Sequence, residues 1–302
     1  MELGMIGLGR MGASMVERLL RAGHRVVVHD MNPAAVAKVV CQGAVGALNH
    51  PRLCAELAPP RAIWLMVPAG EPVDQTIQSL MPQLRPDDTI LDGGNSNYKD
   101  SLRRAAALNA KQLHFVDVGT SGGIWGLTEG YSLMVGGETQ VVERLKPVFQ
   151  ALAPAPDKGW GHVGPNGAGH FAKMVHNGIE YGLMQAYAEG FALMRRKIEF
   201  QLNLHQIAEI WRDGSVVRSW LLDLISKALR ENPDLTGIQP YVDDSGEGRW
   251  TVFESIDLDV SAPVITLSLL ERLRSRDRES FAAQLLAMMR HQFGGHPLKK
   301  EG

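Results

Sequence analysis

One stretch decides the fold of this 302-residue chain: Leu3-Gly4-Met5-Ile6-Gly7-Leu8-Gly9-Arg10-Met11-Gly12. Its first four residues have the pattern of a short buried strand, and a helical pattern follows over 11–22. In such a strand–loop–helix unit, Gly7 permits the tight turn and Gly9 lets the backbone approach a pyrophosphate. Gly12 lets the helix pack against the strand. Because the helix N-terminus offers free N–H groups to phosphates, the stretch predicts a dinucleotide-binding loop.

The next strand pattern, over 24–30, indicates which dinucleotide binds. It ends in Asp30, eighteen residues after Gly12, and Met31-Asn32-Pro33 contributes no arginine. A carboxylate here can accept both ribose hydroxyls of NAD and would repel the extra phosphate of NADP. The other interpretation of Asp30 is a solvated aspartate at a strand end. We predict NAD, held by Gly7, Leu8, Gly9, Arg10, Met11, Gly12, Asp30, Val67 and Asn95.

The remaining pattern predicts two domains of different class. Further strand-like segments at 62–67, 89–92, 113–118 and 131–135 alternate with helical ones. This alternation favours a parallel sheet covered by helices on both faces. From about Ala168, long helical patterns dominate. We therefore predict a Rossmann-type, doubly wound α/β domain over 1–164. An all-α domain with an unusually long first helix follows over 165–302.

Composition excludes several classes of function. The formal net charge is −2, which gives no global attraction to nucleic acid or to an anionic membrane. The longest apolar run, 62–69, is too short to span a bilayer. Cys41 and Cys54 form no Cys-X-X-Cys pair, so neither a disulfide framework nor a zinc site is expected. We find no cluster of metal ligands and expect a cytoplasmic protein without a bound metal.

Two glycine-rich turns follow strands at the edge where doubly wound sheets bind ligands. Asp92-Gly93-Gly94-Asn95-Ser96-Asn97 follows the fourth strand, and Gly119-Thr120-Ser121-Gly122-Gly123 follows the fifth. The first offers an amide side chain, and the second offers a hydroxyl with backbone N–H groups suited to a carboxylate. Taken alone, each is equally consistent with an ordinary polar turn.

A third motif, Lys173-Met174-Val175-His176-Asn177-Gly178-Ile179-Glu180-Tyr181, opens the long helix. Five side chains are spaced at i, i+3, i+4, i+7 and i+8, so they share one helix face over two turns. They are those of Lys173, His176, Asn177, Glu180 and Tyr181. A polar stripe on a helix is often only a solvated face. Because a nicotinamide-binding domain directly precedes it, we interpret this stripe as a wall of the active site.

Together the three motifs resemble those of the 6-phosphogluconate dehydrogenases, in particular the short, NAD-preferring branch of the β-hydroxyacid dehydrogenases. The resemblance covers nearly the whole chain. It implies oxidative decarboxylation of 6-phosphogluconate to ribulose 5-phosphate and CO2 with reduction of NAD. That reaction belongs to the pentose phosphate pathway and to gluconate utilisation. It also implies a homodimer or homotetramer.

The resemblance assigns roles to individual residues. Lys173 would be the general base and Glu180 the general acid. Arg249 stands where the family usually has lysine, and the tail over 290–296 resembles a segment that enters the neighbouring subunit. The segment 124–130 departs from the longer enzymes. The implied substrate-binding residues are Asn95, Ser121, Gly122, Gly123, His176, Asn177, Tyr181, Arg249, Thr251, Arg272, Arg290 and His296.

Two other functions stay open at this point. Another β-hydroxyacid dehydrogenase, acting on a small 3-hydroxy acid without phosphate, would not need Arg249, Arg272 and Arg290. A non-catalytic dinucleotide-binding regulator would keep the glycine loop but would not need Lys173 and Glu180.

Overall fold

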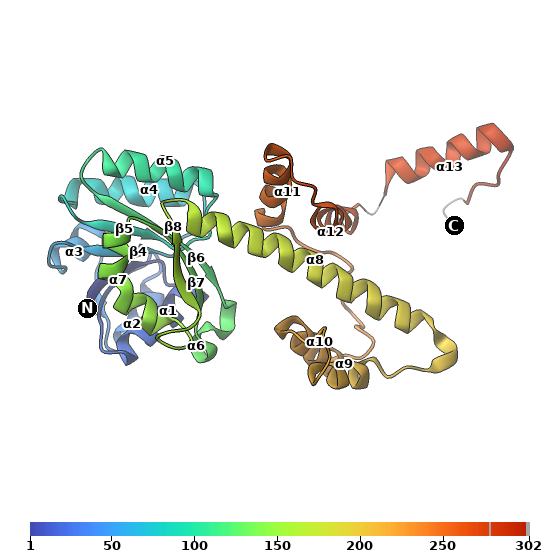
Figure 1. Ribbon diagram of the computed structural model, residues 1–302, viewed down its shortest axis with the longest axis horizontal. Coiled ribbons are helices and arrows are strands. Elements are labelled where there is room, and N and C mark those ends of the chain that lie inside the picture. The colour runs from blue at the N-terminus through green and yellow to red at the C-terminus, as the bar shows by residue number, and fades with distance from the viewer. Residues whose placement is uncertain (278, 300–302) are drawn as a thin grey trace. The chain divides into compact units, whose positions relative to one another are not determined.

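The computed structural model describes residues 1–277 and 279–299, and it divides the chain into two compact units. The first unit is Met1–Asn177 and the second is Gly178–Gly302. The first is a doubly wound α/β unit and the second is helical (Figure 1). The predicted fold class is therefore confirmed.

The first unit is built on an eight-stranded sheet with the order β3-β2-β1-β4-β5-β6-β7-β8. Its strands are β1 (Glu2–Ile6), β2 (Arg25–His29), β3 (Val45–Gly46), β4 (Ala62–Leu65), β5 (Thr89–Asp92), β6 (His114–Ser121), β7 (Ser132–Gly137) and β8 (Trp160–Gly164). Its helices are α1 (Arg10–Arg21), α2 (Pro33–Val40), α3 (His50–Ala55), α4 (Glu71–Leu80), α5 (Tyr98–Asn109), α6 (Gly126–Glu129) and α7 (Thr139–Leu152), with 3-10 turns η1 (Met81–Gln83) and η2 (Gly123–Trp125).

Alternate strand residues of this sheet enter two separate hydrophobic cores. Met5 and Trp64 pack with α1, α2 and α7, whereas Ile6 and Leu65 pack with α3, α4 and α5. Successive side chains of a strand point to opposite faces, so strands buried on both faces read as continuous apolar runs. This explains why the strands gave a strong signal in the sequence.

The sheet differs from the prediction at β3, β6, β7 and β8. The prediction of a parallel sheet was wrong for β7, which pairs antiparallel with β6. That pairing carries β6 on to Ser121, whereas the sequence pattern had ended it at Gly119. β3 has only two residues, and β8 contains two glycines, so neither shows an alternation of apolar and polar residues that would predict a strand.

The second unit contains the remainder of α8 (Ala168–Arg196), whose 29 residues match the predicted long helix. The other elements are η3 (Ile198–Phe200), α9 (Leu204–Arg212), α10 (Trp220–Glu231), α11 (Glu247–Asp257), α12 (Pro263–Arg274) and α13 (Phe281–Gly294). Side chains of Asn203, Ser219 and Ser280 cap α9, α10 and α13. Within the described residues, no helix is both long and apolar enough to cross a membrane.

Candidate active site

A cleft of about 800 Å³ opens in the first unit around the glycine loop. It lies at the carboxyl ends of β1, β2, β4 and β5, where a doubly wound sheet binds its ligand. Of the predicted cofactor-binding residues, only Leu8 is not part of its lining. The others that line it are Gly7, Gly9, Arg10, Met11, Gly12, Asp30, Val67 and Asn95.

The glycine loop has the geometry that a bound pyrophosphate requires. Gly7 has φ +96°, and a Cβ on Gly12 would lie 2.1 Å from the Gly7 carbonyl oxygen, so α1 can start here only without a side chain. At Gly9, by contrast, a Cβ would meet no described atom within 4 Å. Gly9 therefore leaves space in the cleft beside the N-terminus of α1, where a phosphate group fits.

Asp30 joins this loop to the end of β2. One carboxylate oxygen accepts the Leu8 N–H at 2.6 Å, and the other accepts the Asn32 N–H at 2.7 Å. Each oxygen keeps a further lone pair that a ribose hydroxyl can use. The neighbouring Met31 side chain is 96% exposed and offers no positive charge. Asp30 thus holds the loop and still faces the cleft.

Several residues of the cleft gave no signal in the sequence. Gln75 and Thr76 lie in α4, whose sequence contains none of the three motifs. His29 and His50 pack edge to face with ring centroids 4.9 Å apart. The pKa of His50 is lowered by burial and, to a smaller extent, by the charge of His29. His29 ends β2 and His50 begins α3, and no pattern in the sequence shows that these two elements bring the rings together, so sequence reasoning could not find this pair.

Asn95 links the turn after β5 to β6. It has φ +52°, and its side-chain amide pairs with both backbone groups of Thr120. Its Nδ2 donates to the Thr120 carbonyl at 3.0 Å, and its Oδ1 accepts the Thr120 N–H at 2.9 Å. Ser121, Gly122 and Gly123 come next in the chain, with φ of +129° at Gly122 and +51° at Gly123. These two predicted motifs therefore lie together.

The start of α8 is anchored to β6 by charge and by close backbone packing. The fully buried Asp117 carboxylate accepts the N–H groups of Gly167 and His170 at 2.6 and 2.9 Å, next to the helix start. A Cβ on Gly119 would lie 2.4 Å from the Lys173 Cβ, so the helix approaches β6 only because Gly119 has no side chain. Lys173 is thereby held close to the strand that leads to Ser121.

Lys173 makes hydrogen-bond contacts with two neighbours on its own helix face. Its side chain is 5% exposed, and Nζ donates to Asn177 Oδ1 at 2.6 Å. His176 Nδ1 lies 3.3 Å from the same Nζ and 3.0 Å from Asn177 Oδ1. The structure thus brings three predicted residues together around one buried amine. Glu180 is half-buried and lies seven residues later on α8.

In the second unit, Tyr181 and Arg272 stack. The guanidinium carbon of Arg272 lies 3.4 Å from the centre of the Tyr181 ring, and the ring is 5% exposed. Arg272 donates to the Asp243 carbonyl, and the Tyr181 hydroxyl lies 3.3 Å from Ser245 Oγ. No ion pair neutralises Arg272 among the residues that the structure describes.

Arg249 differs because it already has an acidic partner. It donates to Asp244 Oδ2 at 2.8 Å. Burial alone would raise the pKa of Asp244, but the Gly246 N–H and the Arg249 guanidinium lower it overall. Thr251 packs its methyl group against α8, where a Cβ on Gly178 would lie 2.7 Å from it. Both predicted residues are therefore ordered by their own helix α11 and its neighbours.

Arg290 and His296 are not brought to these groups by any hydrogen bond or ion pair within 1–277 and 279–299. α13, all of whose residues are described, has no buried residue. His291 Nδ1 instead lies 2.9 Å from the His296 carbonyl. The two predicted tail residues thus lie on an exposed segment.

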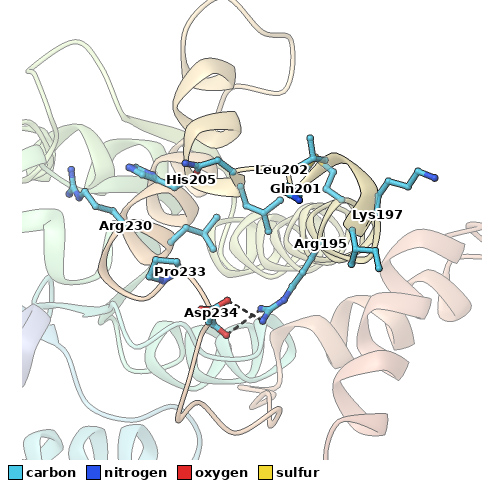
Figure 2. A pocket seen from close by; sticks show the side chains of 13 residues that line it. Arg195, Lys197, Gln201, Leu202, His205, Arg230, Pro233 and Asp234 are labelled. Atoms are coloured by element: carbon cyan, nitrogen blue, oxygen red, sulfur yellow. Dashed lines mark hydrogen bonds and ion pairs between the residues drawn. The ribbon is translucent and has the colours of Figure 1, made fainter.

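A second cavity, of about 580 Å³, lies among the end of α8, the start of α9 and the end of α10 (Figure 2). Arg195, Lys197, His205 and Arg230 line it. Arg195 is paired with Asp234 at 3.5 Å, as the dashed lines show, and Lys197 pairs with Glu199 at 3.2 Å. None of the predicted site residues lines this cavity. The described part of the chain contains no group of three or more His, Cys, Asp or Glu side chains suited to a metal.

Comparison with known proteins identifies the family of this chain. Residues 2–164 match the NAD binding domain of 6-phosphogluconate dehydrogenase, and residues 169–296 match the C-terminal domain of the same enzyme. The chain belongs to the 6-phosphogluconate dehydrogenase family. The resemblance inferred from the three motifs, and the NAD-binding domain inferred from the glycine loop, are confirmed.

Relatives of the family occur in two lengths. A Haloferax volcanii protein named as an NAD(+)-dependent, decarboxylating 6-phosphogluconate dehydrogenase is 46% identical, over all of this chain and 99% of the relative. A Bacillus subtilis protein of the same name is 38% identical, over 94% of this chain but only 63% of its own length. A solved Plasmodium falciparum 6-phosphogluconate dehydrogenase superposes with a TM-score of 0.85 at 25% identity, covering all of this chain and 66% of that one.

Proposed function

We propose that this chain oxidises and decarboxylates 6-phosphogluconate to ribulose 5-phosphate and CO2, with NAD as electron acceptor. The observation that carries the proposal is the full-length match to a relative bearing that name, at 46% identity. Lys173, buried beside His176 and Asn177 at the end of a dinucleotide-binding unit, supports it. We also propose the domain division 1–164 and 165–302, which the extents of the two family matches support.

In this reaction Lys173 Nζ takes the proton of the substrate hydroxyl while the carbon gives up its hydride. The cleft around the glycine loop would hold the NAD, which supplies the hydride acceptor. The resulting β-keto acid loses CO2 by breaking the bond to its carboxylate. The charged ammonium of Lys173 stabilises the oxygen of the enediol that forms. Glu180 then donates a proton to carbon and completes the product.

The proposed substrate-binding residues belong to both units. Asn95, Ser121, Gly122, Gly123, His176 and Asn177 are proposed to hold the sugar-acid part. Tyr181, Arg249, Thr251, Arg272, Arg290 and His296 are proposed to surround the phosphate. Arg272 is the better placed cation, because its described partners are a carbonyl and a thioether rather than a carboxylate. Arg249 already forms an ion pair with Asp244, which partly neutralises its charge.

The preference for NAD is proposed to rest on Asp30. Its carboxylate faces the cleft, and Met31 provides no cation for a 2′-phosphate. The double change Asp30→Ala with Met31→Arg should therefore shift the ratio of kcat/KM toward NADP. A native enzyme that already works better with NADP would contradict this role of Asp30.

We propose a cytoplasmic homodimer or homotetramer in which the tail completes the site of a neighbouring subunit. α13 exposes large apolar side chains, among them Phe281 at 73% and Phe293 at 94%. An apolar groove of about 480 Å³ lies between α8 and α10. Exposed apolar surface of this kind is typical of protein interfaces.

The reaction is tested with a substrate panel. Purified protein is given 6-phosphogluconate, gluconate or a small 3-hydroxy acid, each with NAD and with NADP, while the absorbance of the reduced cofactor and the released CO2 are measured. We expect turnover and CO2 only with 6-phosphogluconate. Turnover of the small 3-hydroxy acid alone would favour the other β-hydroxyacid dehydrogenase, and NAD binding without any turnover would favour a regulator.

A further inference from the structure

Arg104, in α5, is almost completely buried although it lies outside every motif described above. Its side chain is 2% exposed. A buried guanidinium is costly unless its N–H groups find partners. Here Nε donates to Asp74 Oδ1 at 2.9 Å, and Nη1 donates to Asp92 Oδ2 and Ser96 Oγ at 3.2 and 3.1 Å. Nη2 donates to the Gly70 carbonyl and to Asp74 Oδ2 at 2.9 and 3.1 Å.

These partners belong to two different walls of the cofactor cleft. Asp92 and Ser96 enclose the turn whose residues Gly93, Gly94 and Asn95 line the cleft. Gly70 and Asp74 belong to the start of α4, from which Pro72, Gln75 and Thr76 line the same cleft. Arg104 therefore bridges the turn after β5 and the first turns of α4.

The chain of contacts continues from the turn to β6. Asp92 Oδ1 accepts the Gly94 N–H at 3.0 Å, and Asp92 Oδ2 accepts the Ser96 hydroxyl at 2.7 Å. The next link is the reciprocal pair between the Asn95 amide and the Thr120 backbone. A shift of the turn would therefore move Asn95 against both α4 and β6.

We propose that Arg104 is a positioning residue for the oxidation: it sets the separation of the two cleft walls and so places Asn95 against the part of NAD that meets the substrate. The proposal rests on the proposed function, because it presumes that this cleft holds NAD during turnover. Arg104 does not itself touch the substrate. Its fork geometry, which bonds two carboxylates and a carbonyl at once, cannot be reproduced by a single ammonium group.

The neighbouring Arg103 is a matched control. It also donates to Asp74, at 2.9 Å, but its other described partner is Asp100, and its side chain is 57% exposed. It therefore shares the charge and one carboxylate with Arg104 and lacks every contact to the turn. Exposed ion pairs of this kind contribute little to stability.

The experiment compares Arg104→Met, Arg104→Lys and Arg103→Met with the wild type. NADH binding is measured by fluorescence titration, turnover by steady-state kinetics, and folding by thermal melting. We expect Arg104→Met to weaken NADH binding about tenfold. We expect its kcat to fall about 10²-fold, because a misplacement of about 1 Å costs on that order. Arg104→Lys should recover part of both, and Arg103→Met should stay within about twofold of the wild type.

Three outcomes would overturn the proposal. In the first, Arg104→Met has a lower melting temperature but unchanged NADH binding and kcat, which would be a purely structural role. In the second, Arg103→Met loses as much activity as Arg104→Met. The third outcome applies if Arg104→Met does not fold. In that case Ser96→Ala removes one contact between Arg104 and the turn, and unchanged NADH binding in that variant would overturn the proposal. The NADH titration needs no substrate, so failure of the proposed reaction would be distinguished from failure of the positioning role.

Discussion

Gly119→Ala should displace the proposed catalytic lysine without touching the cofactor cleft. A Cβ on Gly119 would lie 2.4 Å from the Lys173 Cβ and 2.6 Å from the Gly169 carbonyl oxygen. Ordinary contact begins near 3.4 Å, so α8 must recede by about 1 Å (3.4 less 2.4 Å). A displacement of that size should lower kcat about 10²-fold. Overpacking of this kind should also lower the free energy of unfolding by about 1–3 kcal/mol.

The assay combines kcat for 6-phosphogluconate with NADH titration and urea denaturation. NADH affinity should stay unchanged, because neither Gly119 nor Lys173 lines the cleft. Gly161→Ala is the control: it adds the same methyl group to β8, where no described atom lies within 4 Å of the new Cβ. A folded Gly119→Ala protein with wild-type kcat would refute the reasoning.

Four further results are expected. Lys173→Met should abolish oxidation while NADH still binds, and loss of NADH binding as well would show that the variant is not a clean test of the base. Glu180→Gln should slow turnover about 10²–10⁴-fold, the usual worth of a positioned acid, and a near-normal rate would exclude that role. Hydrogen bonding from Arg104 lowers the pKa of Asp74 to about 2, so the stability it contributes is complete above the unfolded value of about 3.9 and is lost as pH falls toward 2. Urea melts of wild type and Asp74→Asn should therefore converge over that range, and a constant difference would contradict the pair. Mixed dimers of Arg290→Ala and Lys173→Met should regain activity, whereas subunit exchange shown by mass spectrometry without recovery would place the tail in its own chain.

The fold was predictable where burial leaves a strong pattern. β1, β2, β4 and β5 are covered by helices on both faces, so their central residues are mostly apolar. β7 was misjudged in direction because an antiparallel neighbour and a parallel one give the same run of apolar residues. β3 was missed because two residues carry no period.

The candidate site was predictable where chemistry is local to one stretch of chain. The glycine loop, Asp30 and the stripe that begins at Lys173 each show their pattern within a few residues. Arg104 could not be found in this way, because its partners are 8 to 34 residues away in the chain and meet only after folding. In the sequence it is one arginine of an amphipathic helix.

Asp30 has a consequence for anyone who wishes to redesign the cofactor preference. The carboxylate that would repel a 2′-phosphate is also the acceptor for the Leu8 N–H of the glycine loop. Removing it with alanine changes selectivity and releases the loop in one step, so a gain in NADP use would be masked by a general loss of affinity. Asparagine or serine, which carry an uncharged oxygen acceptor, separate the two effects. A redesign library should therefore start from those residues at position 30.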